Sequence, residues 1–180
     1  VRNQGDAPGV LARAQRRIVA EYYIPHLAHA SMEPPAATAI VRDDRCEAWA
    51  CVQAPQETRE LLARHLGLRL EDVTVHVTLL GGGFGRKSMP DFVAEAALLS
   101  RAMRGAPVKV TWMREDDLRH DYYHAVSVQH LEAALDAQGR PTAWLHRSAA
   151  PTLRATFAAD ARRQSGGEYG QTAIGVPYQI

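Results

Sequence analysis

Apolar and polar positions along the chain repeat with two periods, one typical of strands and one typical of helices. Alternation with a period of two predicts strands over residues 18–24, 37–42, 45–53, 73–80, 108–113, 125–136 and 141–149. Wider apolar spacing predicts helices over residues 7–17, 56–66 and from Pro90 to about residue 104. This mixture indicates an α+β fold of two layers, in which a mixed, mostly antiparallel sheet packs against two main helices.

Local end signals fix several of these elements. Asp6 can cap the first helix, and Pro55 and Gly67 are placed to open and close the second. Pro90 is expected as the first residue of the third helix, with acidic residues in the turn that follows. The charged run over residues 114–117 is expected to be a polar turn.

The long hairpin over residues 125–149 is expected to contain a β-bulge. Val126 and Val128 share one parity, whereas Leu131, Ala133 and Leu135 share the other. Such a change of phase places the bulge near residues 129–130.

Composition and charge narrow the function without identifying it. The 180 residues are 46% hydrophobic, and 21 basic against 20 acidic residues give a net charge of +1. This balance shows no nucleic-acid footprint, and no apolar run approaches the ~20 residues of a membrane-spanning helix. The length predicts one domain over residues 1–180. The start at Val1 and the strand-like end at residues 178–180 predict a fragment of a longer protein.

Cysteine and histidine spacing gives no metal site. Cys46 and Cys51 fall in one predicted strand with odd spacing, so they point to opposite faces and are expected to be buried free thiols. His26 and His29 are three residues apart and His120 and His124 four apart, but neither pair has a third ligand at a usual spacing. We expect packed or hydrogen-bonded histidines.

The glycine-rich stretch over residues 81–88, Gly-Gly-Gly-Phe-Gly-Arg-Lys-Ser, is the clearest candidate for chemistry. Glycine permits positive φ and close approach of the backbone to a ligand. A nucleotide P-loop would need glycine where Arg86 stands, and Pro90 opposes a helix that begins at Lys87. The dinucleotide fingerprint fails at Arg86 as well. A plain strand-to-helix turn remains a second interpretation.

Four motifs together resemble the molybdenum hydroxylases, the xanthine dehydrogenase and aldehyde oxidase family. These are Tyr23-x-Pro25-x-x-x-His29-Ala-x-Met-Glu33-Pro34, Trp49-x-x-x-Gln53-x-Pro55, residues 81–87 and Trp112-Met-Arg-Glu-Asp-Asp117. The resemblance covers residues 18–150. The stretch Arg86-Lys-Ser88 and the motifs near Asp91 and Arg114 look most like the large (β) subunit of isoquinoline 1-oxidoreductase and its membrane-linked aldehyde dehydrogenase relatives.

The resemblance implies a molybdenum pyranopterin cofactor, in its cytosine dinucleotide form. It implies that Gln53 hydrogen-bonds an oxygen ligand of the metal and that Gly82, Gly83, Phe84 and Gly85 lie against the cofactor. The implied reaction is hydroxylation of an N-heterocycle or an aldehyde, with water as the oxygen source. Ser88 follows the loop lysine where xanthine enzymes carry a substrate-orienting glutamate, so it is a substrate-proximal candidate that argues against purines.

The resemblance also sets limits. The catalytic glutamate is expected outside this chain, because Gly166-Gly167-Glu168 follows the glycine loop too closely to supply it. We therefore expect no catalytic residue in this fragment, and inactivity when it is isolated. Iron–sulfur clusters are expected on a small [2Fe-2S] partner subunit, with a cytochrome c subunit as a further partner, on the periplasmic side of a membrane. The alternatives are a non-catalytic scaffold of the same fold and a nucleotide-binding domain that uses residues 81–88.

Overall fold

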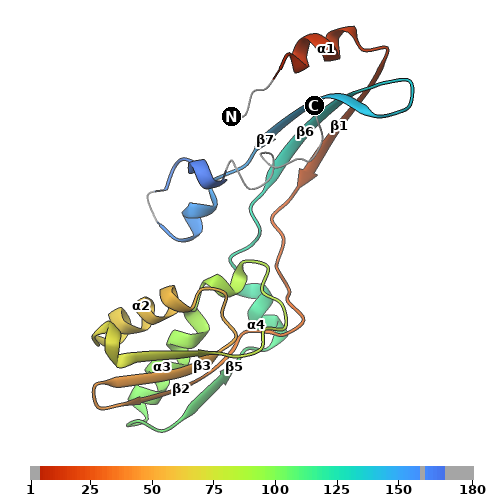
Figure 1. The fold of residues 1–180 in the computed structure, drawn as a ribbon. Coiled ribbons are helices and arrows are strands. Elements are labelled where there is room, and N and C mark those ends of the chain that lie inside the picture. The colour runs from red at the N-terminus through yellow and green to blue at the C-terminus, as the bar shows by residue number, and fades with distance from the viewer. Residues whose placement is uncertain (1–4, 159–160, 169–180) are drawn as a thin grey trace. The chain divides into compact units, whose positions relative to one another are not determined.

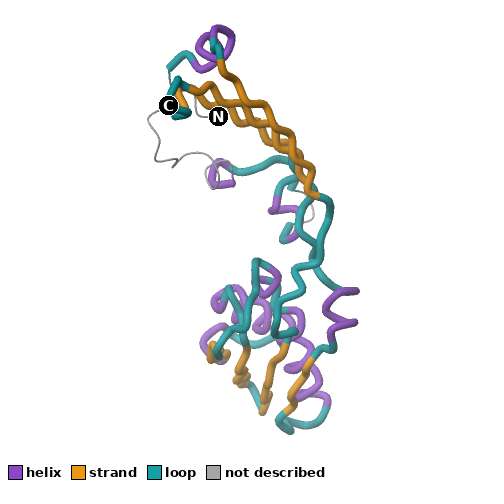
Figure 2. Tube along the Cα trace, turned by 90° about the vertical axis from the view of Figure 1, so that its right-hand side faces the viewer, coloured by secondary structure: helices purple, strands orange, loops and turns teal. Residues whose placement is uncertain are grey.

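A computed structural model describes residues 5–158 and 161–168. The chain forms two compact units, one from Val1–Leu27 with His124–Ile180 and one from Ala28–Tyr123. Figures 1 and 2 draw the elements of each unit, which are described separately below. The single domain expected over residues 1–180 stays a prediction, because a domain is defined by cooperative folding.

The first unit contains a three-stranded antiparallel sheet in the order β1-β6-β7. Its elements are α1 (Ala7–Arg13), β1 (Arg16–Ile24), β6 (Ser127–Leu135) and β7 (Pro141–Ala149). As expected, the Asp6 side chain caps α1 by accepting a hydrogen bond from the Gly9 amide. Leu11 of α1 packs with Ala134 and Ala143 in a small core.

The second unit contains a four-stranded mixed sheet in the order β4-β3-β2-β5 (Figure 1). Its elements are β2 (Ala36–Arg42), β3 (Arg45–Ala50), α2 (Pro55–Leu66), β4 (Val73–Val77), α3 (Asp91–Ala102), β5 (Val108–Thr111) and α4 (Arg114–Arg119). Strands β3 and β4 are parallel and the other pairs are antiparallel. Helices α2 and α3 touch each other and pack against the sheet. The predicted α+β class with two main helices is confirmed, although the strands divide between two sheets.

The main core lies between this sheet and the two helices. Alternate residues of β2 and β3 point inward, and Leu62 of α2 and Phe92 of α3 are fully buried against them. Gly67 ends α2 in the left-handed conformation, as expected from its sequence. Cys46 and Cys51 are both free and buried, as predicted. Burial raises the pKa of the Cys46 thiol to about 11, with a smaller effect of the neighbouring Glu47 carboxylate.

Several predicted details are wrong at element ends. The strand predicted over residues 45–53 ends at Ala50, so Cys51 and Val52 are both buried instead of alternating. The strand predicted to reach residue 80 ends at Val77, and the run over residues 114–117 forms the helix α4. Pro90 is the N-cap of α3, one residue outside the helix.

The predicted bulge position is also wrong. The pairing of β1 with β6 is continuous through Gln129 and His130. The register shift lies instead between Ala134 and Leu135, where β7 carries one extra residue. At the predicted position, His130 instead bonds two carboxylates, those of Glu21 and Glu132. No described helix is long and apolar enough to cross a membrane.

Candidate functional site

Gln53 and the glycine loop, defined as residues 81–85, meet at one place in the second unit. The Gly85 main-chain amide donates to Gln53 Oε1 over 2.9 Å, and the Gln53 main-chain amide donates to the Lys87 carbonyl over 3.0 Å. Because Oε1 accepts from a backbone N–H, the other end of the side chain, Nε2, is left as an outward donor. The structure thus brings together Gln53 and Gly85, two of the residues that the resemblance implies at the cofactor.

The backbone of the loop requires glycine at defined positions. Gly82 and Gly85 have φ values of 97° and 105°, which L side chains rarely adopt. Gly83 needs glycine for another reason, since a Cβ there would lie 2.3 Å from Gln53 Oε1. Phe84 has a φ of 53° and is 74% exposed. The loop therefore presents an aromatic ring and bare backbone on the surface of this unit.

Three loop residues have main-chain amides without a hydrogen-bond partner among the described residues, although Gly83 itself is buried. Among the described residues, the amides of Gly81 and Gly85 have side-chain partners, whereas those of Gly82, Gly83 and Phe84 have none. Together with Gln53 Nε2 they form a set of neutral hydrogen-bond donors. Such a set suits an oxygen-rich or anionic group that approaches the backbone closely.

Lys87 is buried and paired with Glu33. Its side chain is 0% exposed, and Nζ donates to Glu33 Oε2 over 2.8 Å. The same carboxylate oxygen accepts from the Gly81 amide over 2.9 Å. Burial by itself raises the pKa of the Glu33 carboxyl, but the hydrogen bonds from Lys87 and Gly81 outweigh it and lower the pKa below its ordinary value. Lys87 is thus held inside the unit, which argues against the nucleotide-binding interpretation of this loop.

Arg86 is also buried and fixes the end of the loop. Its guanidinium donates to both carboxylate oxygens of Asp91, each over 3.0 Å, and Nε lies 3.4 Å from Asp121. The group is stacked between Trp112 and Tyr122, with its central carbon 5.1 Å and 5.0 Å from the two ring centroids. Paired and stacked in this way, Arg86 joins the loop to the start of α3.

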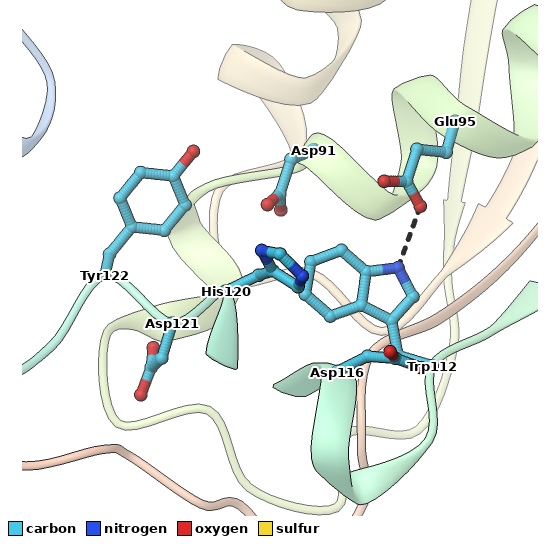
Figure 3. Close-up of a pocket in the computed structure, with 7 residues that line it drawn as sticks. All are labelled: Asp91, Glu95, Trp112, Asp116, His120, Asp121 and Tyr122. Carbon is cyan, nitrogen blue, oxygen red and sulfur yellow. Dashed lines mark hydrogen bonds between the residues drawn. The ribbon is translucent and has the colours of Figure 1, made fainter. Parts of the chain in front are cut away.

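Carboxylates and aromatic rings line a cavity of about 620 Å³ in the second unit (Figure 3). Glu95 accepts a hydrogen bond from Trp112 Nε1 over 2.8 Å, and Asp91 is occupied by Arg86. Neither Gln53 nor any residue of the glycine loop lines it. The cavity and the predicted cofactor residues are therefore separate features, and we base the site on the loop geometry.

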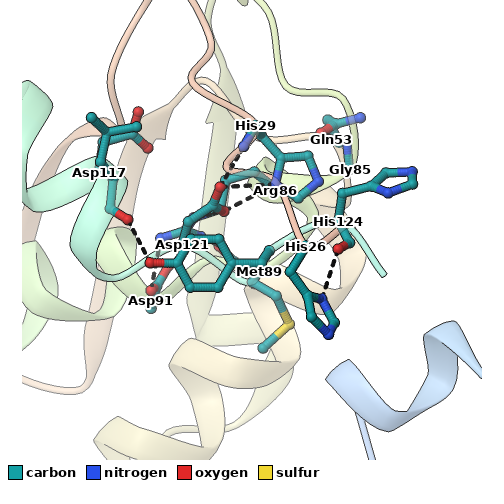
Figure 4. A network of polar contacts seen from close by, with 12 residues as sticks. His26, His29, Gln53, Gly85, Arg86, Met89, Asp91, Asp117, Asp121 and His124 are labelled. Atoms are coloured by element: carbon teal, nitrogen blue, oxygen red, sulfur yellow. Dashed lines mark hydrogen bonds and ion pairs between the residues drawn. The ribbon is translucent and has the colours of Figure 1, made fainter. Parts of the chain in front are cut away.

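The other sequence candidates have structural partners. His26 Nδ1 lies 3.0 Å from the His124 carbonyl oxygen, and His29 contacts Asp121, so both are hydrogen-bonded as expected (Figure 4). No group of three potential metal ligands occurs in the described part of the chain. Ser88 lies in a 3₁₀ turn over Arg86–Ser88, where its amide donates to the Gly85 carbonyl.

Glu168 is bound by its own surroundings. Its carboxylate accepts from the Thr152 hydroxyl and the Leu153 amide, and also from the Ser165 amide. The Ser165 hydrogen bond, followed by the others, lowers the pKa of this carboxyl to about 2, although desolvation opposes it. A carboxylate that holds a proton so weakly is a poor general base at neutral pH. The expected catalytic base outside this chain stays a prediction.

The comparisons with known proteins show the family of the chain. The family model described as molybdopterin cofactor-binding domain matches residues 1–152. The chain belongs to this family. The match extends over both units, so the resemblance inferred from the four motifs is confirmed.

Two curated relatives and one solved structure illustrate the similarity. The chain is 37% identical over 130 residues to the membrane-bound aldehyde dehydrogenase [pyrroloquinoline-quinone] of Gluconacetobacter polyoxogenes. This alignment covers 72% of this chain and 17% of that protein. It is 38% identical over 123 residues to the isoquinoline 1-oxidoreductase subunit beta of Brevundimonas diminuta, covering 67% of this chain and 16% of that protein. The chain thus spans about a sixth of the length of these relatives.

A solved structure has the same fold at lower sequence identity. The aldehyde oxidoreductase of Desulfovibrio gigas superposes with a TM-score of 0.65 and 19% identity, covering 83% of this chain and 16% of that one. This likeness confirms the fold class.

The sequence did not reveal the pairings that hold the loop. Glu33 and Lys87 both stand in the family motifs, but their ion pair joins positions 54 residues apart. Asp121, which contacts both His29 and Arg86, was missed as well. The sequence did contain one signal for these pairings, namely charged residues inside the family motifs. A charged side chain that is buried needs a partner of opposite charge.

Proposed function

We propose that this chain is part of the molybdenum-cofactor-binding region of an oxidoreductase subunit, which hydroxylates an N-heterocycle or an aldehyde with oxygen from water. The observation that carries the proposal is the hydrogen bond from the Gly85 amide to Gln53 Oε1. It orients Gln53 Nε2 as a donor beside the three unpartnered amides of the loop. The membership in the molybdopterin-binding family supports the same assignment.

The residues present fit such a cofactor. Gln53 Nε2 would donate to an oxygen ligand of the metal, and the amides of Gly82, Gly83 and Phe84 would approach the pterin at contact distance. The bound cofactor supplies the two-electron redox chemistry. The exposed Phe84 ring would exclude water on one side of the site, where hydrogen bonds must remain strong. We propose the cytosine dinucleotide form of the cofactor.

The remaining functions are assigned outside residues 1–180. We propose that a glutamate elsewhere in the parent subunit is the catalytic base, since Glu168 is held as a stable carboxylate. We propose a [2Fe-2S] partner subunit and a cytochrome c subunit as electron acceptors, and the name of the β-subunit relative supports an assembly of several subunits. Association with the periplasmic side of a membrane is supported by the name of the membrane-bound relative. The isolated fragment is expected to be inactive.

One relative carries a different cofactor in its printed name, pyrroloquinoline quinone. The family model names molybdopterin instead, and it is matched over residues 1–152. Because the family model describes the domain that this chain matches, a molybdenum pyranopterin is the proposed cofactor. The two cofactors differ in metal and in fluorescence, so one preparation distinguishes them.

The test is metal and pterin analysis of the full-length parent subunit, purified with its neighbouring subunits from its own host. We expect about one molybdenum and one pterin per subunit. Gly85→Val should lower both, because valine cannot readily adopt the φ of 105° at this position. Gly166→Ala is the matched control, since a Cβ there has nothing within 4 Å. A well-folded wild type without molybdenum would overturn the proposal and favour the scaffold, and pyrroloquinoline quinone in its place would assign the other cofactor.

A further inference from the structure

The segment over residues 29–33 runs beside the glycine loop and forms a second wall next to it. The Glu33 amide donates to the Gly81 carbonyl over 3.0 Å. Farther along, the Met32 amide nitrogen lies 3.8 Å from the position of a Cβ on Gly82. At the other end, His29 Nε2 lies 3.9 Å from the position of a Cβ on Gly85. The imidazole of His29 and the side chain of Gln53 therefore both lie next to Gly85 (Figure 4).

The orientation of the His29 ring is fixed by Asp121. Nδ1 lies 3.0 Å from each carboxylate oxygen of Asp121, and the His29 main-chain amide donates to the same carboxylate. The Asp121 side chain is only 1% exposed, and Arg86 Nε lies 3.4 Å away on its other side. A carboxylate accepts hydrogen bonds, so in the neutral ring the proton is on Nδ1 and Nε2 is an acceptor.

His29 Nε2 has no hydrogen-bond partner among the described residues. The side chain is 11% exposed, and Nε2 is not among the atoms that are fully buried without a partner. The next residue, Ala30, has a φ of 44°, a strained value for a residue other than glycine. A bend of this kind is retained where the surroundings hold it, and such positions concentrate at functional sites. An oriented, accessible acceptor thus adjoins the set of loop donors.

We infer that His29 is a cofactor-binding residue whose Nε2 accepts a hydrogen bond from an N–H group of the pterin bound against Gly85. This inference rests on the proposed function. The oxygens of such a group face donors, and its ring and amino N–H groups need acceptors. The other side chain next to Gly85 is that of Gln53, whose acceptor oxygen already accepts a hydrogen bond from the Gly85 amide. His29 Nε2 supplies the acceptor.

Two substitutions separate this role from a structural one. In His29→Asn, the side-chain nitrogen takes the place of Nδ1 and keeps a donor toward Asp121, but no atom takes the place of Nε2. In His29→Gln, the distal amide reaches the place of Nε2, but the donor toward Asp121 is lost. Both variants are made in the full-length parent subunit and purified with its partners. Molybdenum, pterin and the half-life of pterin release are measured, together with the Tm of the cofactor-free protein.

The inference predicts that His29→Asn loses pterin about fivefold faster than wild type, as expected for one net hydrogen bond, with an unchanged cofactor-free Tm. His29→Gln should retain more cofactor than His29→Asn. His26→Asn is the control, because that exposed histidine hydrogen-bonds the His124 carbonyl within the first unit, whereas the glycine loop belongs to the second, and it should release pterin at the wild-type rate. Wild-type retention in His29→Asn with loss in His29→Gln would overturn the inference and make His29 a support for Asp121. A wild type without pterin would instead refute the proposed function.

Discussion

Gly83→Ala tests how tightly the glycine loop is fitted to Gln53. A methyl group at this position would lie 2.3 Å from Gln53 Oε1 and 2.6 Å from its amide carbon. Both atoms belong to the end of a flexible side chain, so the side chain moves and the backbone stays. The movement breaks the 2.9 Å hydrogen bond from the Gly85 amide, which orients Gln53 toward the cofactor.

The cost to stability is small. Losing one exposed hydrogen bond removes about 1 kcal/mol. Replacing glycine by alanine where φ is not positive returns roughly 0.4–1 kcal/mol by restricting the unfolded chain. The free energy of unfolding of the cofactor-free subunit should therefore change by less than about 1 kcal/mol. The cofactor content should fall sharply, because the oriented donor is lost.

A double-mutant cycle with Gln53→Ala makes the argument quantitative. The three atoms nearest to the added methyl group all belong to the part of Gln53 that alanine lacks, so Gly83→Ala should change cofactor release little in the Gln53→Ala background. Release of molybdenum and pterin is followed in wild type, both single variants and the double variant. Additive effects of the two substitutions would refute the reasoning, because they would mean that residue 83 acts on the cofactor without Gln53.

Four other predictions concern Glu33, Lys87 and Cys46. Glu33→Ala should destabilise the protein by about 1–3 kcal/mol, less than for a fully buried pair because the Glu33 side chain is 38% exposed, and Lys87→Met by less; denaturant unfolding measures both. Folding lowers the pKa of Glu33, so its contribution to the free energy of unfolding is present above about pH 4.5, the ordinary value, and is lost as pH falls below it. The difference in unfolding free energy between wild type and Glu33→Ala should therefore narrow in acid. A difference that stays constant with pH would contradict the ion pair. Excess Mg-ATP should leave the Tm unchanged because Lys87 is enclosed, whereas a rise in Tm that Lys87→Met abolishes would restore the nucleotide-binding interpretation. Cys46, with a pKa of about 11 and 2% exposure, should resist iodoacetamide at pH 8 until denaturant is added, and rapid labelling of the native protein would show that the core is open.

Local signals in the sequence predicted most helices and strands. The predictions that were wrong concern features that depend on contacts between residues far apart in the sequence. The left-handed glycine at the end of α2 was predictable, because the cap depends on the residue itself. The end of β3 at Ala50 was not, because it depends on parallel pairing with β4, where Ala50 and Val77 are the last partners. Helix α4 was mistaken for a turn, because its charged residues carry no apolar stripe.

The site was predictable in part for the same reason. The strand-to-helix glycines mark close backbone approach in the sequence alone, and the family motifs added Gln53. The fixed orientation of Gln53 depends on an amide 32 residues away. The ion pair between Glu33 and Lys87, and the contact between His29 and Asp121 across 92 residues, exist only in the folded chain. In the nucleotide-binding alternative Lys87 would contact a phosphate, whereas its complete burial gives it a structural role.

The most direct test is a crystal structure of the full-length parent subunit with its cofactor bound. We expect Gln53 Nε2 within about 3 Å of a cofactor oxygen, while Gln53 Oε1 still accepts from the Gly85 amide. The amides of Gly82, Gly83 and Phe84 should face the cofactor at contact distance. A cofactor bound away from this loop, with Gln53 turned to solvent, would contradict the account.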